Sequence, residues 1–205
     1  MLLPRILARG DEMKRTILAV FALAFTPFAV IAQQPANAAQ NPAPPASGPE
    51  ANPVSSTVRK ILDRESKIMV AAADEMPADK FSFRPTPAQI TFAHLVMHMA
   101  GSNNALCSAI SGTAAPAQEK LDEADPKDKL VGALRSSFDF CTQALSKVDD
   151  SNLGEQVKFF GGRTISRAGA MIALTNDFSD HYSGAAMYLR LNGLLPPTAQ
   201  QQHKD

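Results

Sequence analysis

The sequence contains no tryptophan, only two tyrosines and no excess of charge of either sign. Twenty basic side chains are balanced by twenty acidic ones, so the formal net charge is zero. Domains that bind nucleic acid normally present a basic face, and those that bind single strands stack the bases on aromatic side chains. We therefore expect no nucleic-acid partner and no attraction to an anionic membrane surface.

The N-terminal segment has the organisation of a secretory signal peptide. "MKRTILAVFALAFTPFAVIA", residues 13–32, joins a basic start to a long apolar stretch, and Val30 and Ala32 stand at the small-residue positions before cleavage. We expect translation to begin at Met13 and the signal peptide to end at residue 32, so that residues 1–32 are absent from the mature protein. The apolar run falls short of the ~20 residues of a spanning helix, and an uncleaved anchor is the alternative. The mature protein is thus expected in the periplasm or outside the cell, without a membrane anchor.

The rest of the chain divides by composition into three parts. Residues 33–53, "QQPANAAQNPAPPASGPEANP", are too poor in large apolar side chains to fold, and we expect a disordered linker. Residues 54–199 have the length of one domain with a sizeable core. Residues 200–205 form a polar tail. No cysteine lies near the expected cleavage site, so a lipid-anchored form is not supported.

Cysteine is scarce, since Cys107 and Cys141 are the only two. An exported protein meets an oxidising compartment, which allows a disulfide between them. Two buried free thiols are the alternative, because helix geometry decides whether the sulfurs can meet. The sequence leaves both outcomes open.

Four amphipathic segments, each with a helix start signal, follow the linker. Three prolines within "MPADKFSFRPTPAQI" separate the first two, and "SNLGEQVKFFGGRTIS" indicates a loop with a short hairpin at Gly161–Gly162. No period-two strand pattern and no internal repeat competes with the helices. We predict an all-α fold, a four-helix bundle. Its helices are expected after the candidate caps Ser55 and Ser56, from about 91 to 111, after Asp125–Pro126, and from Ser166 to Asn192–Gly193.

Ionisable side chains occupy positions in or beside the apolar stripes. His181 is central in the last helix, with Asp177 one turn earlier, while Glu65 lies among apolar residues of the first helix and His98 flanks the stripe of the second. An unpaired buried carboxylate is costly, and a divalent cation would compensate it. Two histidines and a carboxylate form a known ligand set that leaves positions open for water or substrate. We therefore predict a metal site of His98, Asp177 and His181, with Glu65 as an additional candidate ligand.

Each of these residues also has a purely structural interpretation. Asp177 could form an ion pair with Arg163 or Arg167, and Glu65 could pair with a lysine at one end of the bundle. A single histidine in a core is more often hydrogen-bonded than bound to metal. His94, one turn before the candidate on the second helix, could instead chelate a surface metal together with it.

Four stretches of the chain carry a family resemblance: "MPADKFSFRPTP", "TFAHLVMHMAGSNNALC", "ALRSSFDFC" and "DHYSGAAMYLRLNGLLPP". Together they resemble the DinB-like superfamily of metalloenzymes, which includes the YfiT-type proteins, over about residues 54–197. The last stretch is the most specific, because it combines a histidine, Tyr-Leu-Arg, Asn-Gly and a double proline. The resemblance implies an up-down-down-up four-helix bundle, often a homodimer, in which one histidine of helix two and an H-x-x-x-H pair of helix four hold a divalent metal.

By this resemblance His98 matches the ligand of helix two, and His181 matches the second histidine of helix four. Asp177 stands where the first histidine of that pair is expected. Aspartate can bind zinc, nickel, manganese or iron, so the site can persist with a harder ligand. A degenerate site is the alternative, because aspartate is shorter than histidine.

Some relatives of this fold are transferases or isomerases that depend on bacillithiol or mycothiol. An exported protein would not meet these cytosolic thiols, so we set that function aside. The sequence predicts a metal-dependent hydrolase or transferase whose small-molecule substrate it does not identify. A non-catalytic binding or interaction bundle with a reduced metal site is the alternative.

Overall fold

The computed structural model describes residues 48–117 and 119–202. The chain divides into two units, Met1–Ala46 and Ser47–Asp205, and every described residue belongs to the second. The predicted signal peptide, residues 33–47 of the predicted linker and the last three residues of the predicted tail lie outside the described residues. Within the described ranges, no helix combines the length and the apolar character needed to cross a membrane.

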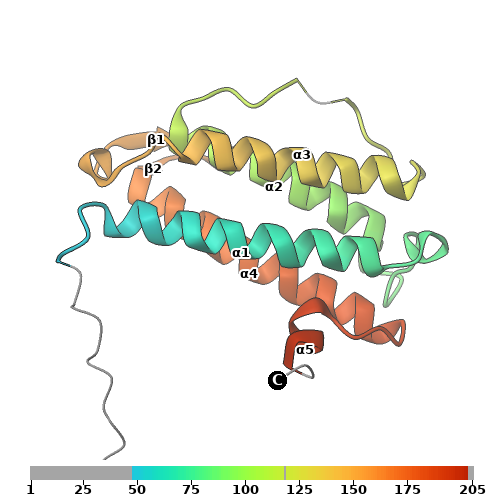
Figure 1. Ribbon diagram of the computed structural model, residues 1–205. Coiled ribbons are helices and arrows are strands. Elements are labelled where there is room, and N and C mark those ends of the chain that lie inside the picture. Colours follow the sequence, from blue (N-terminus) through green and yellow to red (C-terminus); the bar gives the residue numbers. More distant parts are fainter. Residues whose placement is uncertain (1–47, 118, 203–205) are drawn as a thin grey trace, which may run out of the picture. The chain divides into compact units, whose positions relative to one another are not determined.

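Four long helices make up most of the described chain (Figure 1), which confirms the predicted all-α bundle. A two-stranded antiparallel hairpin lies between the third and fourth helices, and single 3-10 turns occur in the loops. The helices are α1 (Pro53–Glu75), α2 (Phe92–Ser111), α3 (Lys127–Leu145), α4 (Arg167–Leu191) and a short α5 (Pro197–Gln202); the strands are β1 (Gln156–Lys158) and β2 (Thr164–Ser166); the 3-10 turns are η1 (Ala78–Lys80), η2 (Asp150–Asn152) and η3 (Phe160–Gly162).

Capping residues account for three of the helix boundaries. The hydroxyls of Thr91 and Ser166 each accept a backbone N–H from the first turn of α2 and α4, respectively. Past the end of α4, Gly193 adopts a φ of +74°, which glycine takes without strain. These three boundaries lie where the sequence predicts them.

The predicted caps Ser55 and Ser56 of the first helix are wrong. Helix α1 already begins at Pro53. Proline suits this position, because the N–H that it lacks would have no hydrogen-bond partner within the helix. The N–H groups of Val54 and Ser55 donate to the two carboxylate oxygens of Asp150, at 2.8 Å each. The group that caps α1 therefore lies 95 and 96 residues further along the chain, where a local sequence pattern cannot reveal it.

Two further elements accompany the four predicted helices. The hairpin predicted at Gly161–Gly162 is present, and these two glycines form its turn at φ values of +67° and +73°. Its strands β1 and β2, which no period-two pattern indicates, pair in register with Val157 opposite Ile165. Three-residue strands are too short for a period-two pattern to show. Pro197 begins a further short helix, α5, because proline suits the first position of a helix.

The four long helices follow an up-down-down-up order (Figure 1). Near the start of α1, Arg59 donates to the carbonyl of Val148 just after α3, at 2.8 Å, so α1 and α3 run antiparallel. Near the end of α4, the Tyr188 hydroxyl donates to the carbonyl of Ile90 just before α2, at 2.6 Å, so α2 and α4 also run antiparallel. Helices α2 and α3 point the same way, and a long connection returns along the bundle between them.

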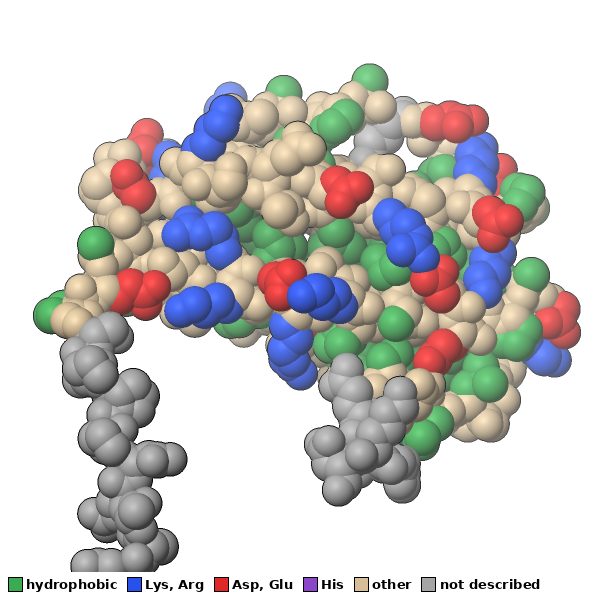
Figure 2. Space-filling view, viewed as in Figure 1, with side chains coloured by type: hydrophobic (Ala, Val, Ile, Leu, Met, Phe, Trp, Pro, Cys, Tyr) green, Lys and Arg blue, Asp and Glu red, His purple; other side chains and the backbone are tan. Residues whose placement is uncertain are grey.

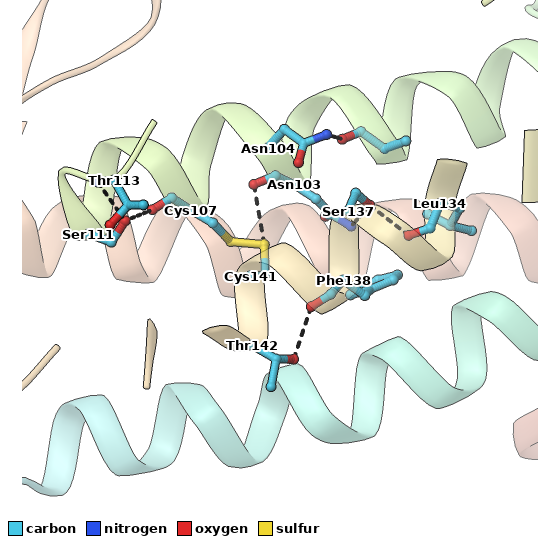
Figure 3. Close-up of a disulfide and its surroundings, with 11 residues drawn as sticks. Asn103, Asn104, Cys107, Ser111, Thr113, Leu134, Ser137, Phe138, Cys141 and Thr142 are labelled. Atoms are coloured by element: carbon cyan, nitrogen blue, oxygen red, sulfur yellow. Dashed lines mark hydrogen bonds between the residues drawn. A yellow bond between two sulfur atoms is a disulfide. The ribbon is translucent and has the colours of Figure 1, made fainter. Parts of the chain in front are cut away.

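A disulfide joins the two parallel helices α2 and α3 (Figure 3). Cys107 and Cys141 are both fully buried, and their Cα atoms lie 5.2 Å apart. One turn earlier on α2, the side-chain amide of Asn103 donates to the hydroxyl of Ser137 on α3, at 3.0 Å. Adjacent helices share no backbone hydrogen bonds, so these side-chain links fix the height of α2 against α3.

Apolar side chains from all four helices meet in one core. The rings of Phe138 and Phe178 pack across α3 and α4, with centroids 5.8 Å apart. Figure 2 shows the side that α1 presents, where acidic and basic side chains are interspersed and no histidine is seen. Two ionisable residues are exceptions to the apolar interior, since Glu65 and His181 are both buried.

Candidate metal centre

Asp177 and His181 face each other along α4, because residues four apart lie on the same side of a helix. Asp177 Oδ2 lies 3.2 Å from His181 Nδ1, and the His181 side chain is only 7% exposed. The separation of the two atoms is short enough for an ion pair, but their geometry does not form a hydrogen bond. Both atoms are shielded from solvent and have no hydrogen-bond partner. Shielded polar atoms normally have partners. A cation between these two would supply one.

His98 on α2 brings a second imidazole to His181. The two rings meet edge to face, with centroids 5.0 Å apart and planes at 89°. Helices α2 and α4 pack closely at this level, since a Cβ built on Gly184 would lie only 3.7 Å from the side chain of Leu95. His98 is exposed whereas His181 is buried, so the two histidines span the distance from the surface to the interior.

Glu65 is buried in α1 with only 3% of its surface exposed. One carboxylate oxygen accepts a bond from Arg64 at 2.7 Å, and the other is shielded without a partner. The pairing with a lysine considered from the sequence is therefore wrong. Burial raises the pKa of the Glu65 carboxyl, and the charge of Arg64 offsets part of that effect.

Glu65 lies at about the height of the Asp177–His181 pair. Asp150 accepts a hydrogen bond from the start of α1. Three residues later in the same loop, the carbonyl of Leu153 accepts the N–H of Ala168 at the start of α4, at 3.0 Å. The two helices therefore begin at similar levels. Glu65 follows the start of α1 by twelve residues, and Asp177 follows the start of α4 by ten. As the side chains lie, however, no three His, Cys, Asp or Glu residues of the described ranges form a group that could hold a metal ion.

The arginines considered as partners of Asp177 are engaged elsewhere, so that interpretation is wrong. Arg163 Nε donates to the carbonyl of Phe160 at 3.3 Å. Arg167 pairs with Glu155 at 2.7 Å. The near neighbour of Asp177 is the histidine on its own helix.

His94 belongs to a different cluster. Its Nδ1 lies 2.9 Å from one oxygen of Glu123, and the other oxygen accepts the Thr91 hydroxyl at 2.6 Å. The hydrogen bond from Thr91, followed by that from His94, lowers the pKa of Glu123 below its ordinary value. The cluster fastens the α2–α3 connection to the start of α2. The sequence gives no sign of Glu123, because a charged residue in a polar loop has no distinguishing pattern.

A pocket of about 410 Å³ opens beside His98. It is bounded by one face of α2 and by the tip of the hairpin. A larger hollow, of about 490 Å³, lies between α1 and α3. The cations Lys67 and Arg135 of that hollow already pair with Asp63 and Asp74, so it offers less for a ligand to bind. The residues that line the smaller pocket are His94, Met97, His98, Gly101, Ser102 and Phe160.

Residues 61–181 of the chain match the sequence profile of the DinB superfamily. The match spans more than half of the chain and contains Glu65, His98, Asp177 and His181. This chain belongs to the DinB superfamily. No curated protein matches it in sequence.

Solved DinB-like proteins share the fold of this DinB superfamily member. A DinB-like protein from Bacillus cereus is 16% identical, with a TM-score of 0.58 over 69% of this chain and 95% of that one. A second, from Bacillus subtilis, is 17% identical, with a TM-score of 0.55 over 67% and 92% of the two chains. A histidine-to-alanine mutant of a mycothiol-dependent maleylpyruvate isomerase is 14% identical, with a TM-score of 0.51 over 63% and 59%. At these identities, the similarity establishes the fold alone.

Proposed function

We propose that this DinB superfamily protein is an exported metal-dependent enzyme, a hydrolase or transferase that acts on a small molecule. His98, Asp177 and His181 would hold the metal. The observation that carries the proposal is the 3.2 Å approach of Asp177 Oδ2 to His181 Nδ1 without a shared hydrogen bond, next to a second imidazole whose ring lies 5.0 Å away.

The spacing of these atoms fits a divalent metal. Two ligand atoms each about 2.0–2.1 Å from a tetrahedral ion lie about 3.3 Å apart. The 3.2 Å between Asp177 Oδ2 and His181 Nδ1 agrees with that separation. His98 is exposed, so its side-chain torsions are free to turn a ring nitrogen toward the pair. Zinc, nickel, manganese and iron all accept imidazole and carboxylate ligands, and Glu65 is available as a further one.

The chain's own residues define how a substrate would reach this site. When bound, the metal would act as a Lewis acid that lowers the pKa of a coordinated water or thiol. His98 lies both at the pocket and against His181, so a small molecule entering the pocket meets it first. Asp177 Oδ2 and His181 Nδ1 are shielded from solvent, which strengthens their electrostatic interactions.

Export is part of the proposal. The signal-like segment at residues 13–32 supports it, and so does the disulfide between Cys107 and Cys141, because such bonds persist in oxidising compartments. The isomerase with a similar fold depends on mycothiol. An exported protein would not meet a cytosolic thiol, so we propose water or another small nucleophile in its place.

Elemental analysis of the untagged mature protein, purified from the periplasm, tests the proposal. We expect about one divalent metal ion per chain, the stoichiometry of a single site with three protein ligands. His181→Ala should lose the metal, whereas His94→Ala, which changes the Glu123 cluster, should keep it. A protein that carries no metal and gains no thermal stability from zinc, nickel or manganese would refute the proposal.

A second candidate is a non-catalytic exported bundle that binds a ligand or a partner. It is favoured by the observation that no three ligand side chains gather among the described residues. This candidate predicts no metal-dependent turnover of simple esters, amides or phosphates. Turnover that requires the metal and fails in His181→Ala would exclude it.

A further inference from the structure

Phe160 is a large apolar residue at the tip of the hairpin, and 49% of its surface is exposed to solvent. It precedes Gly161 and Gly162, whose positive φ values form a turn that other residues would strain. Its ring lies 4.9 Å from that of Phe159, centroid to centroid. Arg163 donates to its carbonyl and covers the ring of Phe159, 5.6 Å from the centroid. These contacts hold the exposed ring in place.

Phe160 forms one wall of the pocket beside His98, and the remaining walls belong to α2. Met97 contributes a second apolar wall, with a sulfur that contacts aromatic rings favourably. At Gly101, no atom lies within 4 Å of the place where a Cβ would stand, so the missing side chain leaves room. His98 and Ser102 add polar groups. The pocket thus combines an aromatic wall, an open floor and hydrogen-bonding side chains.

The glycine at position 101 is not explained by packing or by backbone geometry. Glycine is among the least favourable residues inside a helix, and Gly101 lies in the middle of α2 with ordinary helical geometry. An alanine there would meet no neighbouring atom. What the glycine does provide is volume beside Phe160 and His98.

We infer that this pocket binds a compact molecule with an aromatic group, seated between Phe160 and Met97 above Gly101, with a polar group toward His98. A volume of about 410 Å³ is typical of small-molecule sites. Edge-to-face aromatic contacts and sulfur–aromatic contacts favour a flat ring over an alkyl chain. No lysine or arginine lines the pocket. The aromatic ligand would be the substrate class of the proposed enzyme. Only the metal-binding end of that ligand rests on the proposed function.

Two pairs of probes test the inference. Benzohydroxamate and acetohydroxamate share a metal-binding head and differ by the ring, so calorimetry on the zinc-loaded protein measures what the ring adds. Benzamide and acetamide, titrated into the metal-free protein and followed by the NMR signal of the Met97 methyl group, measure the same quantity without metal. We expect the aromatic member of each pair to bind about tenfold more tightly or better.

Each outcome separates the inference from the proposed function. Equal affinities for the two members of each pair would overturn the inference. If the protein nevertheless binds zinc, the proposed metal site would stand. If zinc does not bind, the metal proposal fails, and the benzamide pair alone decides whether the aromatic site exists.

Variants with matched controls localise the effect. Phe160→Ser and Gly101→Leu should each abolish the preference for the aromatic probe. Ile172→Ser removes another exposed apolar side chain, on α4 and outside the pocket. Gly132→Leu changes another helical glycine with nothing within 4 Å of its Cβ position, on α3. Both controls should keep the preference. A preference that survives Phe160→Ser, or that is lost equally in the controls, would overturn the inference.

Discussion

The imidazole ring of His98 meets that of His181 edge to face, with centroids 5.0 Å apart, although the two residues belong to different helices. The antiparallel course of α2 and α4 brings them to the same level, where a Cβ at Gly184 would lie in van der Waals contact with Leu95. His181 in turn faces Asp177. Three side chains from two helices therefore form a chain of contacts from the pocket to the interior.

If Asp177 is a ligand, its replacement changes metal affinity. Asp177→Ala should weaken zinc binding at least about tenfold, since even residues that support a ligand contribute tenfold or more. Asp177→His should keep zinc, because it supplies the imidazole expected from the family resemblance. Competition with a chromophoric chelator measures both. Asp180→Ala, at an exposed position of the same helix, is the control, and an equal loss there would contradict a specific role for Asp177.

Glu65 should destabilise the metal-free protein increasingly as the pH rises. Burial raises the pKa of its carboxyl above the ordinary 4.5, so the folded state holds the proton more tightly than the unfolded state. Stability therefore falls as the pH rises from about 4.5 through the folded-state pKa. Relative to wild type, Glu65→Gln should be more stable at pH 8 than at pH 4. Urea unfolding in the presence of a chelator measures the difference, and a pH-independent difference would contradict the argument.

Glu123 should behave in the opposite way. The hydrogen bonds from Thr91 and His94 lower its pKa below 4.5 in the folded state. Its contribution to stability is therefore complete above pH 4.5 and is lost as the pH falls through the folded-state pKa. Glu123→Gln should be less stable than wild type at pH 7, and the gap should close toward pH 3. Asp139→Asn, at an exposed position of α3, should show no such closing gap in thermal unfolding.

The disulfide should contribute substantially to stability. It closes a loop with a sequence separation of 34 residues. Loop-closure entropy predicts a loss of roughly 3–4 kcal/mol in the free energy of unfolding for the double variant Cys107→Ala with Cys141→Ala. Chemical denaturation of the variant beside oxidised wild type tests this. Equal midpoints would show that the bond adds nothing to the packing of α2 against α3.

The sequence predicts the parts of this molecule that are encoded locally. Amphipathic periodicity and caps such as Thr91 and Ser166 are properties of neighbouring residues, so the bundle and most helix ends follow from them. The position of His181 in the apolar stripe likewise follows from spacing alone, and the structure buries it.

Features that depend on distant partners could not be predicted. The carboxylate of Asp150 caps α1 from the loop that follows α3, and Glu123 reaches His94 from the α2–α3 connection. The exposure of His98 depends on how α2 rotates against α4, which a helical wheel does not fix. The place of Phe160 beside the α2 pocket depends on how the hairpin packs against α2, which the sequence of the hairpin does not indicate.

The sulfur bridge between α2 and α3 encloses the long connection that separates them in sequence. A protease that cuts one peptide bond in that connection, between residues 112 and 126, would produce two polypeptides that stay covalently attached. A nicked sample would migrate as a single band on a denaturing gel until a reductant is added, when two bands would appear. On a denaturing gel without reductant, a single band at the expected mass therefore does not establish that the backbone of this protein is uncut.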